Sequence, residues 1–161
     1  MSAQEQFEVF LWILYAMGLG ALVGLEREFR GHEAGFRTTA LVCGGAAVFG
    51  EIGQVFDESR VAASVVQGIG FLGAGLLWQR GGSVRGVTTA ATIWVMAAVG
   101  LVVGLELWLL PLLISLTLIL VLELAPVSDR ILTFSREHGQ AHGTSKPSEE
   151  REPPRNEISD S

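Results

Sequence analysis

Few side chains in the apolar part of this sequence could carry chemistry, and the ionisable ones are the most informative. Glu51 lies within a run of mainly apolar residues, and Gln67 lies within the next run. An ionisable group at membrane depth is costly, so it indicates a functional site or a paired structural group. We expect Glu51 either to bind a cation or carry a proton, or to be a protonated or hydrogen-bonded carboxyl. Gln67 is expected to hydrogen-bond to a neighbouring helix.

Other oxygen-bearing side chains lie at the ends of the apolar runs. Thr88 and Thr89 open the fourth run, where their hydroxyls either line a path or bond back to their own helix. Asp57 and Glu58 lie in a tight turn, and carboxylate oxygens are ligands that suit a hydrated Mg²⁺. The candidates for binding or passing a cation are therefore Glu51, Asp57, Glu26, Gln67, Thr88 and Thr89.

A cluster of charges is expected where several runs end on one side. Glu26 and Arg27 follow the first run, Arg37 precedes the second and Arg85 precedes the fourth. The arginines are explained either as anchors whose charged ends reach the membrane surface or by an internal ion pair of Glu26 with an arginine that seals the bundle. The pattern holds no nucleophile with a base and no metal-ligand spacing, which predicts that the protein is not an enzyme and has no resident cofactor. Mg²⁺ is the ligand or substrate that the acidic groups suggest.

One motif resembles a nucleotide-binding loop. Gly68-Ile-Gly70-Phe-Leu-Gly73 fits G-x-G-x-x-G, but that fingerprint needs a preceding strand and an acidic residue about 20 positions later. Position 93 is Ile, and the glycines lie in the middle of an apolar run. The glycines are therefore interpreted as helix-packing residues, because small side chains let membrane helices approach closely.

The elements that must hold these groups are five apolar runs, since about 20 apolar residues are needed to cross a bilayer. We predict an all-α bundle of five transmembrane helices, with a break between the last two near Gly104 and Pro111. Their ranges are Phe7–Leu25, Thr38–Phe56, Val61–Trp78, Val87–Leu105 and Leu107–Leu124. Residues 1–125 form this domain. Residues 126–161 are polar and are expected to be mostly disordered, with a short surface helix near 128–138.

The distribution of basic residues predicts the topology. Arginines follow spans one and three and precede spans two and four, the polar tail is basic as well as acidic, and only Arg60 lies on the opposite side. The positive-inside rule then puts the N-terminus outside and the C-terminus in the cytoplasm of a bacterial inner membrane. The net charge of −6 argues against a nucleic-acid surface. The expected partners are the lipid bilayer, a second copy of the chain and other membrane proteins.

Small residues recur at helical spacing on four of the spans. We expect the third span to lie at the centre of the bundle, so that a bulky residue at Gly70 or Gly73 disrupts it. The leucine-rich fifth span is expected to face lipid or another subunit. The glycines assigned to packing are Gly20, Gly24, Gly68, Gly70, Gly73, Gly75, Gly100 and Gly104.

Three blocks together resemble the MgtC/SapB family of bacterial membrane proteins. They are GALVGLEREFRGHEAGFRTTALV from Gly20, DESRVAASVVQGIGFLGAGLLW from Asp57 and VRGVTTAATIWVMAAVGLVVG from Val84. The sequence departs from the family pattern in having Glu58 where a proline is usual and Phe36 where a leucine is usual. Better-known members continue into a folded cytoplasmic domain, in place of which this sequence has the polar segment 126–161.

The resemblance implies an inner-membrane protein linked to magnesium limitation. It names two functions: Mg²⁺ transport, and regulation without transport through other membrane proteins, such as restraint of the ATP synthase. The positions that match the family pattern are Glu26, Arg27, Gly35, Arg37, Thr38, Asp57, Arg60, Gly68, Gly70, Gly73, Gly75, Arg85, Gly86, Thr88, Thr89 and Trp94.

Overall fold

The computed structural model describes residues 2–58, 60–80 and 83–140. The described chain has five helices: α1 (Ala3–Phe29), α2 (Phe36–Val55), α3 (Arg60–Gly75), α4 (Val87–Val103) and α5 (Leu109–Gln140). Two short strands, β1 (Trp78–Arg80) and β2 (Ser83–Arg85), separate α3 from α4. The chain divides into a unit Met1–Glu123, which holds α1 to α4 and the beginning of α5, and a unit Leu124–Ser161.

Local sequence signals set where the first two helices begin and end. The Ser2 hydroxyl and the Glu5 carboxylate cap each other's backbone at the start of α1. Gly31 ends α1 in a left-handed conformation, and its N–H and that of His32 bond back to the last turn. Asp57 ends α2 in the same way, since it has a positive φ and its N–H bonds to Gln54 O at 3.2 Å.

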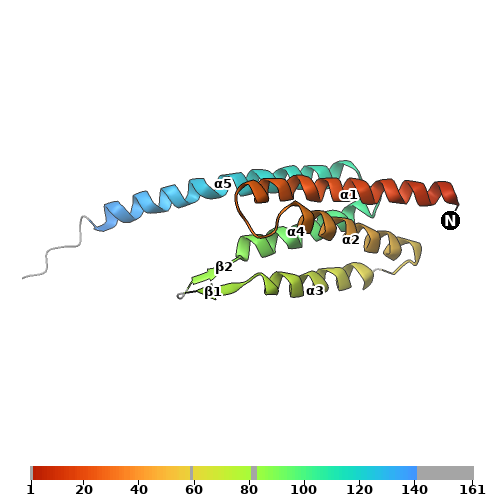
Figure 1. The fold of residues 1–161 in the computed structure, drawn as a ribbon, viewed down its shortest axis with the longest axis horizontal. Helices are drawn as coiled ribbons and strands as arrows, with labels where there is room; N and C mark the ends of the chain where they lie inside the picture. The colour runs from red at the N-terminus through yellow and green to blue at the C-terminus, as the bar shows by residue number, and fades with distance from the viewer. Residues whose placement is uncertain (1, 59, 81–82, 141–161) are drawn as a thin grey trace, which may run out of the picture. The chain divides into compact units, whose positions relative to one another are not determined.

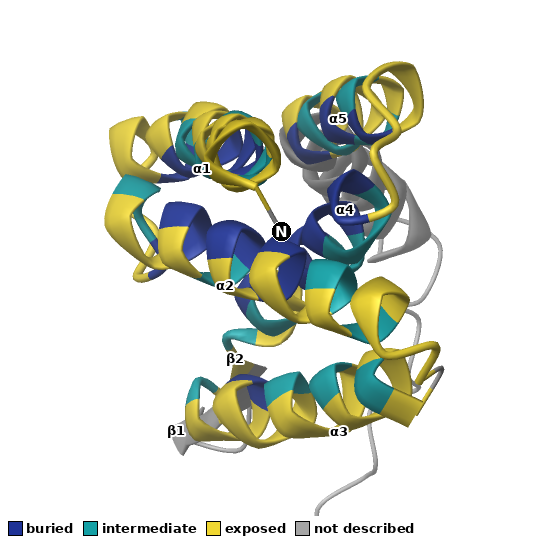
Figure 2. Ribbon diagram, turned by 90° about the vertical axis from the view of Figure 1, so that its right-hand side faces the viewer, coloured by how far each residue is buried: buried dark blue, intermediate teal, exposed yellow. Residues whose placement is uncertain are grey.

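The centre of the Met1–Glu123 unit is α2, which packs between α1 and α4 (Figure 2). A Cβ at Gly24 would come within 2.0 Å of Thr39 Oγ1, and one at Gly100 within 2.1 Å of Cys43 O. Gly20 and Gly104 meet the α2 backbone in the same manner. Glycine on α1 and on α4 thus brings both helices directly against the backbone of α2.

The expected central position of the third span is wrong. α3 lies at the edge, beneath α2 and α4, and Gly73 is its one buried residue among those described (Figure 2). A Cβ at Gly68, Gly70 or Gly75 would meet nothing within 4 Å. Among the described residues these three glycines do not serve close packing, and a Cβ at Gly70 has room. The reason is that spacing reveals a small-residue face but not which helix lies against it.

The first part of α5 packs beside α1 and α4. Leu122 belongs to the same buried cluster as Val23, Met96 and Val99, and Leu112, Ile114, Leu118 and Ile119 pack against that cluster. At the link between α4 and α5, the Tyr15 hydroxyl donates to Trp108 O at 2.6 Å. Leucines at other positions of this segment are exposed, so one face of it has no partner among the described residues of the Met1–Glu123 unit.

Two of the sequence-based boundaries need correction. Residues 78–80 and 83–85 form an antiparallel ribbon in which Trp78 pairs with Arg85, so the third span ends before Trp78. Apart from this short ribbon, the regular structure of the described residues is helical, as predicted. Gly86 joins the ribbon to α4 with φ +85°, and a Cβ there would collide with Leu76 O. The last helix continues through Gln140, so it passes the boundary expected at residue 125 and includes the range 128–138, for which a separate short helix was predicted. The rest of the predicted tail, 141–161, lies outside the described residues.

The helices have the composition of a membrane protein. α1 and α2 are each long and apolar enough to cross a bilayer, whereas Val87–Val103 and Leu109–Leu124 are apolar but shorter. Phe10, Leu11 and Leu14 on α1 are about half exposed, as are many leucines of α5. This much exposed apolar surface suits a lipid environment better than water.

Candidate functional site

The strongest candidate site is a group of charged side chains where α1 ends. Arg27 is only 2% exposed, although a guanidinium is one of the groups least often buried. Its terminal nitrogen Nη2 donates to the Thr89 hydroxyl of α4 at 3.3 Å, and its Nε has no partner among the described residues. The glycine packing of α1 on α2 carries Arg27 into the bundle, where Thr89 supplies its acceptor.

Glu26 and Arg30 extend the group toward α5. Arg30 Nε lies 2.8 Å from Glu26 Oε1, and Arg30 also pairs with the Glu123 carboxylate. Both Glu26 oxygens are buried without a hydrogen bond from the described residues, so the Glu26–Arg30 contact is electrostatic and not an aligned hydrogen bond. The group therefore holds two carboxylates and two guanidiniums, whose formal charges balance.

A third link ties α1 to α2. Glu28 Oε2 accepts the backbone N–H of Phe36 at 3.1 Å, which satisfies a free donor in the first turn of α2. A Cβ at Gly35 would lie 2.6 Å from the same carboxylate oxygen, so glycine leaves room for it. Through Glu28, Arg27 and Arg30, one turn of α1 is bonded to α2, to α4 and to the beginning of α5.

The structure brings together only part of the predicted charge cluster. Arg37 is exposed and lies with its guanidinium carbon 5.7 Å from the Phe36 ring centroid, and Arg85 is exposed at the end of β2. The sealing ion pair predicted for Glu26 is made with Arg30, which the prediction did not include. Glu28 and Glu123 were also missed. The i, i+4 spacing of Glu26 and Arg30 was the signal for Arg30, whereas no local pattern indicated Glu28 or Glu123.

The predicted cation ligands are divided between the two ends of the bundle. Glu26 and Thr89 lie at the charged end, and Thr88 is exposed close by in the first turn of α4. Glu51 and Asp57 lie near the other end of α2, and Gln67 is exposed on α3. About 18 Å of helix separates Thr39, beside Gly24, from Glu51 at 1.5 Å per residue. No three acidic, histidine or cysteine side chains of the described residues lie close enough together to hold a metal ion.

Glu51 and Asp57 have identifiable surroundings at their own end. Glu51 is close enough to Glu106 for the two carboxyl groups to interact electrostatically. The neighbouring Gln54 amide donates to Gly104 O on α4. Asp57 lines a small cavity of about 440 Å³ with Glu58, Gln54 and apolar residues of α4. Its left-handed backbone gives Asp57 a role in ending α2 that is independent of any cation.

Apolar helices with exposed apolar faces, and a charge group at one end in which Arg27 is buried, are typical of a membrane-associated helical protein. The MgtC family model matches residues 13–131. The chain belongs to the MgtC family, as the three sequence blocks predicted.

The curated relatives cover part of the chain at high identity. Protein MgtC of Salmonella typhimurium is 49% identical over 102 residues, which are 62% of this chain and 44% of that protein. Protein MgtC of Brucella abortus is 50% identical over 90 residues, which are 53% of this chain and 38% of that protein. The matched part of the chain is thus less than half the length of these relatives. No solved structure matches the chain.

Proposed function

We propose that this protein is a five-span protein of the bacterial inner membrane, with its N-terminus outside and its C-terminus in the cytoplasm. The helices of the Met1–Glu123 unit run alternately in opposite directions, so the end of α1 and the beginnings of α2 and α4 lie together (Figure 1). These ends carry Arg27, Arg37 and Arg85, which suits the cytoplasmic leaflet. α3 has 16 residues and spans about 24 Å, so its flanking residues must reach the two membrane surfaces or the bilayer must adapt to the shorter helix.

A topology reporter tests this placement directly. A fusion after Gln140 is expected to be active as a cytoplasmic reporter and inactive as a periplasmic one, and a fusion in the α2–α3 turn is expected to behave in the opposite way. Equal cytoplasmic activity at both sites would overturn the five-span arrangement.

Within the membrane, we propose a role in magnesium homeostasis that is exerted through other membrane components and not through a Mg²⁺ path in a single chain. The observation that carries this proposal is the division of the candidate oxygen ligands between opposite ends of the bundle, with closely packed glycine interfaces between them. A hydrated Mg²⁺ can be held by one or two carboxylates, so a path through one chain needs such groups along its length and not only at its two ends. The magnesium link itself comes from the family resemblance, and the proposal includes no enzymatic step and no resident cofactor.

Transport is the second candidate, because Glu51 interacts electrostatically with Glu106 and lies toward the end of α2, six residues before Asp57. Like charges held near one another inside a membrane are the kind of arrangement that a cation would stabilise. On this alternative the ion enters at the outer end of α2. A path onward to Glu26 would have to form between α2 and a neighbouring helix.

Purified protein in liposomes that contain a Mg²⁺ indicator separates the two candidates. We expect influx no faster than in empty liposomes, both for the natural sequence and for Glu51→Gln. Influx that Glu51→Gln removes and the exposed control Glu8→Gln retains would overturn the proposal in favour of transport. For the regulatory role, co-reconstitution with a bacterial ATP synthase is expected to reduce ATP-driven acidification of the vesicles, and unchanged acidification would exclude this partner.

A further inference from the structure

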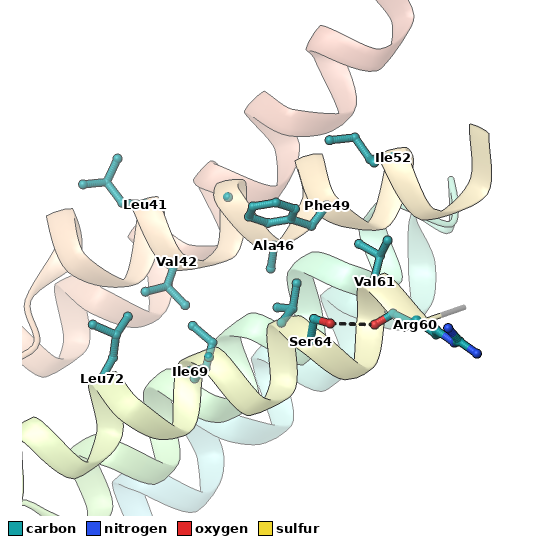
Figure 3. Close-up of a pocket in the computed structure, with 13 residues that line it drawn as sticks. Leu41, Val42, Ala46, Phe49, Ile52, Arg60, Val61, Ser64, Ile69 and Leu72 are labelled. Atoms are coloured by element: carbon teal, nitrogen blue, oxygen red, sulfur yellow. Dashed lines mark hydrogen bonds between the residues drawn. The ribbon is translucent and has the colours of Figure 1, made fainter. Parts of the chain in front are cut away.

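A wide apolar groove lies between α2 and α3, and nothing within the described chain fills it. Its volume is about 810 Å³, within the range of roughly 300–1,000 Å³ that is usual for ligand pockets. α2 and α3 supply facing aliphatic and aromatic side chains (Figure 3). They include Val42, Phe49, Ile52, Val61, Val65 and Ile69.

Glycine makes this groove. Gly45 on α2 and Gly68 on α3 both line it, and a Cβ at either position would meet nothing within 4 Å. These glycines do not bring the two helices into contact, in contrast to the glycines between α1, α2 and α4. Space has been left where two apolar helices could have packed, which indicates an occupant that the chain itself does not supply.

The polar groups of the groove lie at one end. The Ser64 hydroxyl donates to Arg60 O at 3.0 Å, so it is satisfied within α3. Arg60 lies at one end of the groove, and its guanidinium points away from the apolar residues (Figure 3). The ion pairs of the described residues join Arg30 to Glu26 and to Glu123, and Arg60 takes part in neither. An apolar groove with one cation at its end matches a ligand that has an apolar chain and an anionic head.

We propose that the groove binds one phospholipid of the outer leaflet, with an acyl chain along α2 and α3 and the phosphate at Arg60. From Arg60 to Leu72 the groove follows α3 for about 18 Å at 1.5 Å per residue. One leaflet contributes about 15 Å, half of the hydrocarbon core. The length of the groove and the position of its cation thus fit a lipid whose head lies at the membrane surface.

A second copy of the chain fits this space less well. A helix about 10 Å across and 30 Å long occupies about 2,400 Å³, roughly three times the groove volume. A docking helix from another subunit would therefore leave most of its own surface outside the groove. The groove also presents no free polar group along its length that would select one protein sequence, whereas a flexible acyl chain needs none.

The test uses the full chain in detergent with added dioleoylphosphatidylglycerol, and native mass spectrometry counts bound lipids and chains together. Gly68→Leu and Gly45→Leu fill the groove without a backbone clash and are each expected to lower lipid affinity at least tenfold. Gly70→Leu is the matched control, because Gly70 lies on the same helix, does not line the groove and has equally open surroundings. It is expected to bind lipid as the natural sequence does.

Arg60→Gln tests the head group separately. Loss of a charge-assisted hydrogen bond is expected to weaken phosphatidylglycerol about tenfold. The same substitution should leave the affinity for dioleoylglycerol, which has the same chains and no phosphate, unchanged. Equal lipid binding by the natural chain and Gly68→Leu would overturn the proposal. So would an equal loss in Gly70→Leu, or a lipid-free dimer that Gly68→Leu converts to monomer.

This inference rests on the membrane position proposed above but not on magnesium. If the proposed topology is wrong, the reporters will be active on the other sides of the membrane. If the proposed lipid site is wrong, the groove variants will keep their lipid affinity and their topology. Circular dichroism of each variant confirms that the helices are retained.

Discussion

Gly100 and Gly70 differ sharply in the space that surrounds them. Both lie in apolar helices, yet only one meets another backbone. A Cβ at Gly100 would stand 2.1 Å from Cys43 O and 2.8 Å from the Ala46 Cβ, whereas a Cβ at Gly70 would meet nothing. We therefore predict that Gly100→Ala destabilises the bundle and that Gly70→Ala does not.

The magnitude follows from the required displacement. Ordinary contact at a Cβ begins near 3.4 Å, so α4 must move away from α2 by about 1.3 Å to admit the new methyl group. A gap of 0.5–1 Å already removes a quarter to a half of the dispersion energy of each contact along the interface. Overpacking on this scale costs about 1–3 kcal/mol, and the rigid carbonyl at Cys43 places Gly100→Ala near the upper limit. Gly70→Ala keeps all contacts and gains up to about 1 kcal/mol of helix propensity.

Thermal unfolding in a mild detergent, followed by tryptophan fluorescence, measures both variants under one condition. We expect the midpoint of Gly100→Ala to fall clearly below that of the natural chain, and the midpoint of Gly70→Ala to equal or exceed it. Gly18→Ala, an open position on α1, is the control for a glycine substitution elsewhere in the bundle. Equal midpoints for Gly100→Ala and Gly70→Ala would refute the central position of α2.

Three further substitutions test individual contacts. Thr89→Val removes the acceptor of Arg27 without changing the shape of the side chain. Denaturation is expected to show a loss of about 1–3 kcal/mol, because a buried guanidinium loses its partner. An unchanged unfolding curve would contradict the hydrogen bond between Arg27 and Thr89. Tyr15→Phe removes the donor to Trp108 O and is expected to cost about 1 kcal/mol in the same assay, with the helical content unchanged. Asp57→Gly is expected to be neutral or stabilising and Asp57→Ala to cost about 1 kcal/mol, because the backbone there is left-handed; equal stability of the two indicates that the conformation carries no strain.

The helices themselves were predictable because each is a long apolar run with identifiable ends. The predicted range Thr38–Phe56 became α2 at Phe36–Val55, and Val87–Leu105 became α4 at Val87–Val103. The break before the fifth helix was also predicted, and Glu106 in a left-handed conformation lies there. Apolar composition and glycine spacing are local properties, so the sequence contains them in full.

Which faces meet was not predictable from the same signals. Gly20 and Gly68 look alike in the sequence, but Gly20 touches the α2 backbone, whereas Gly68 lines the groove between α2 and α3. Partner choice depends on the order of helices around the bundle, which a repeat of small residues does not encode. The charge group shows the same limit: Glu26 and Arg30 are a turn apart, whereas Glu123 joins them from 93 positions beyond Arg30.

The continuous backbone contacts on two sides of α2 restrict how this protein can change shape. Inserting or deleting one residue in α2 would rotate everything beyond it by about 100° and remove both glycine interfaces from register at once. A sliding or twisting movement of α2 meets the same obstacle, so α1, α2 and α4 behave as one rigid spine.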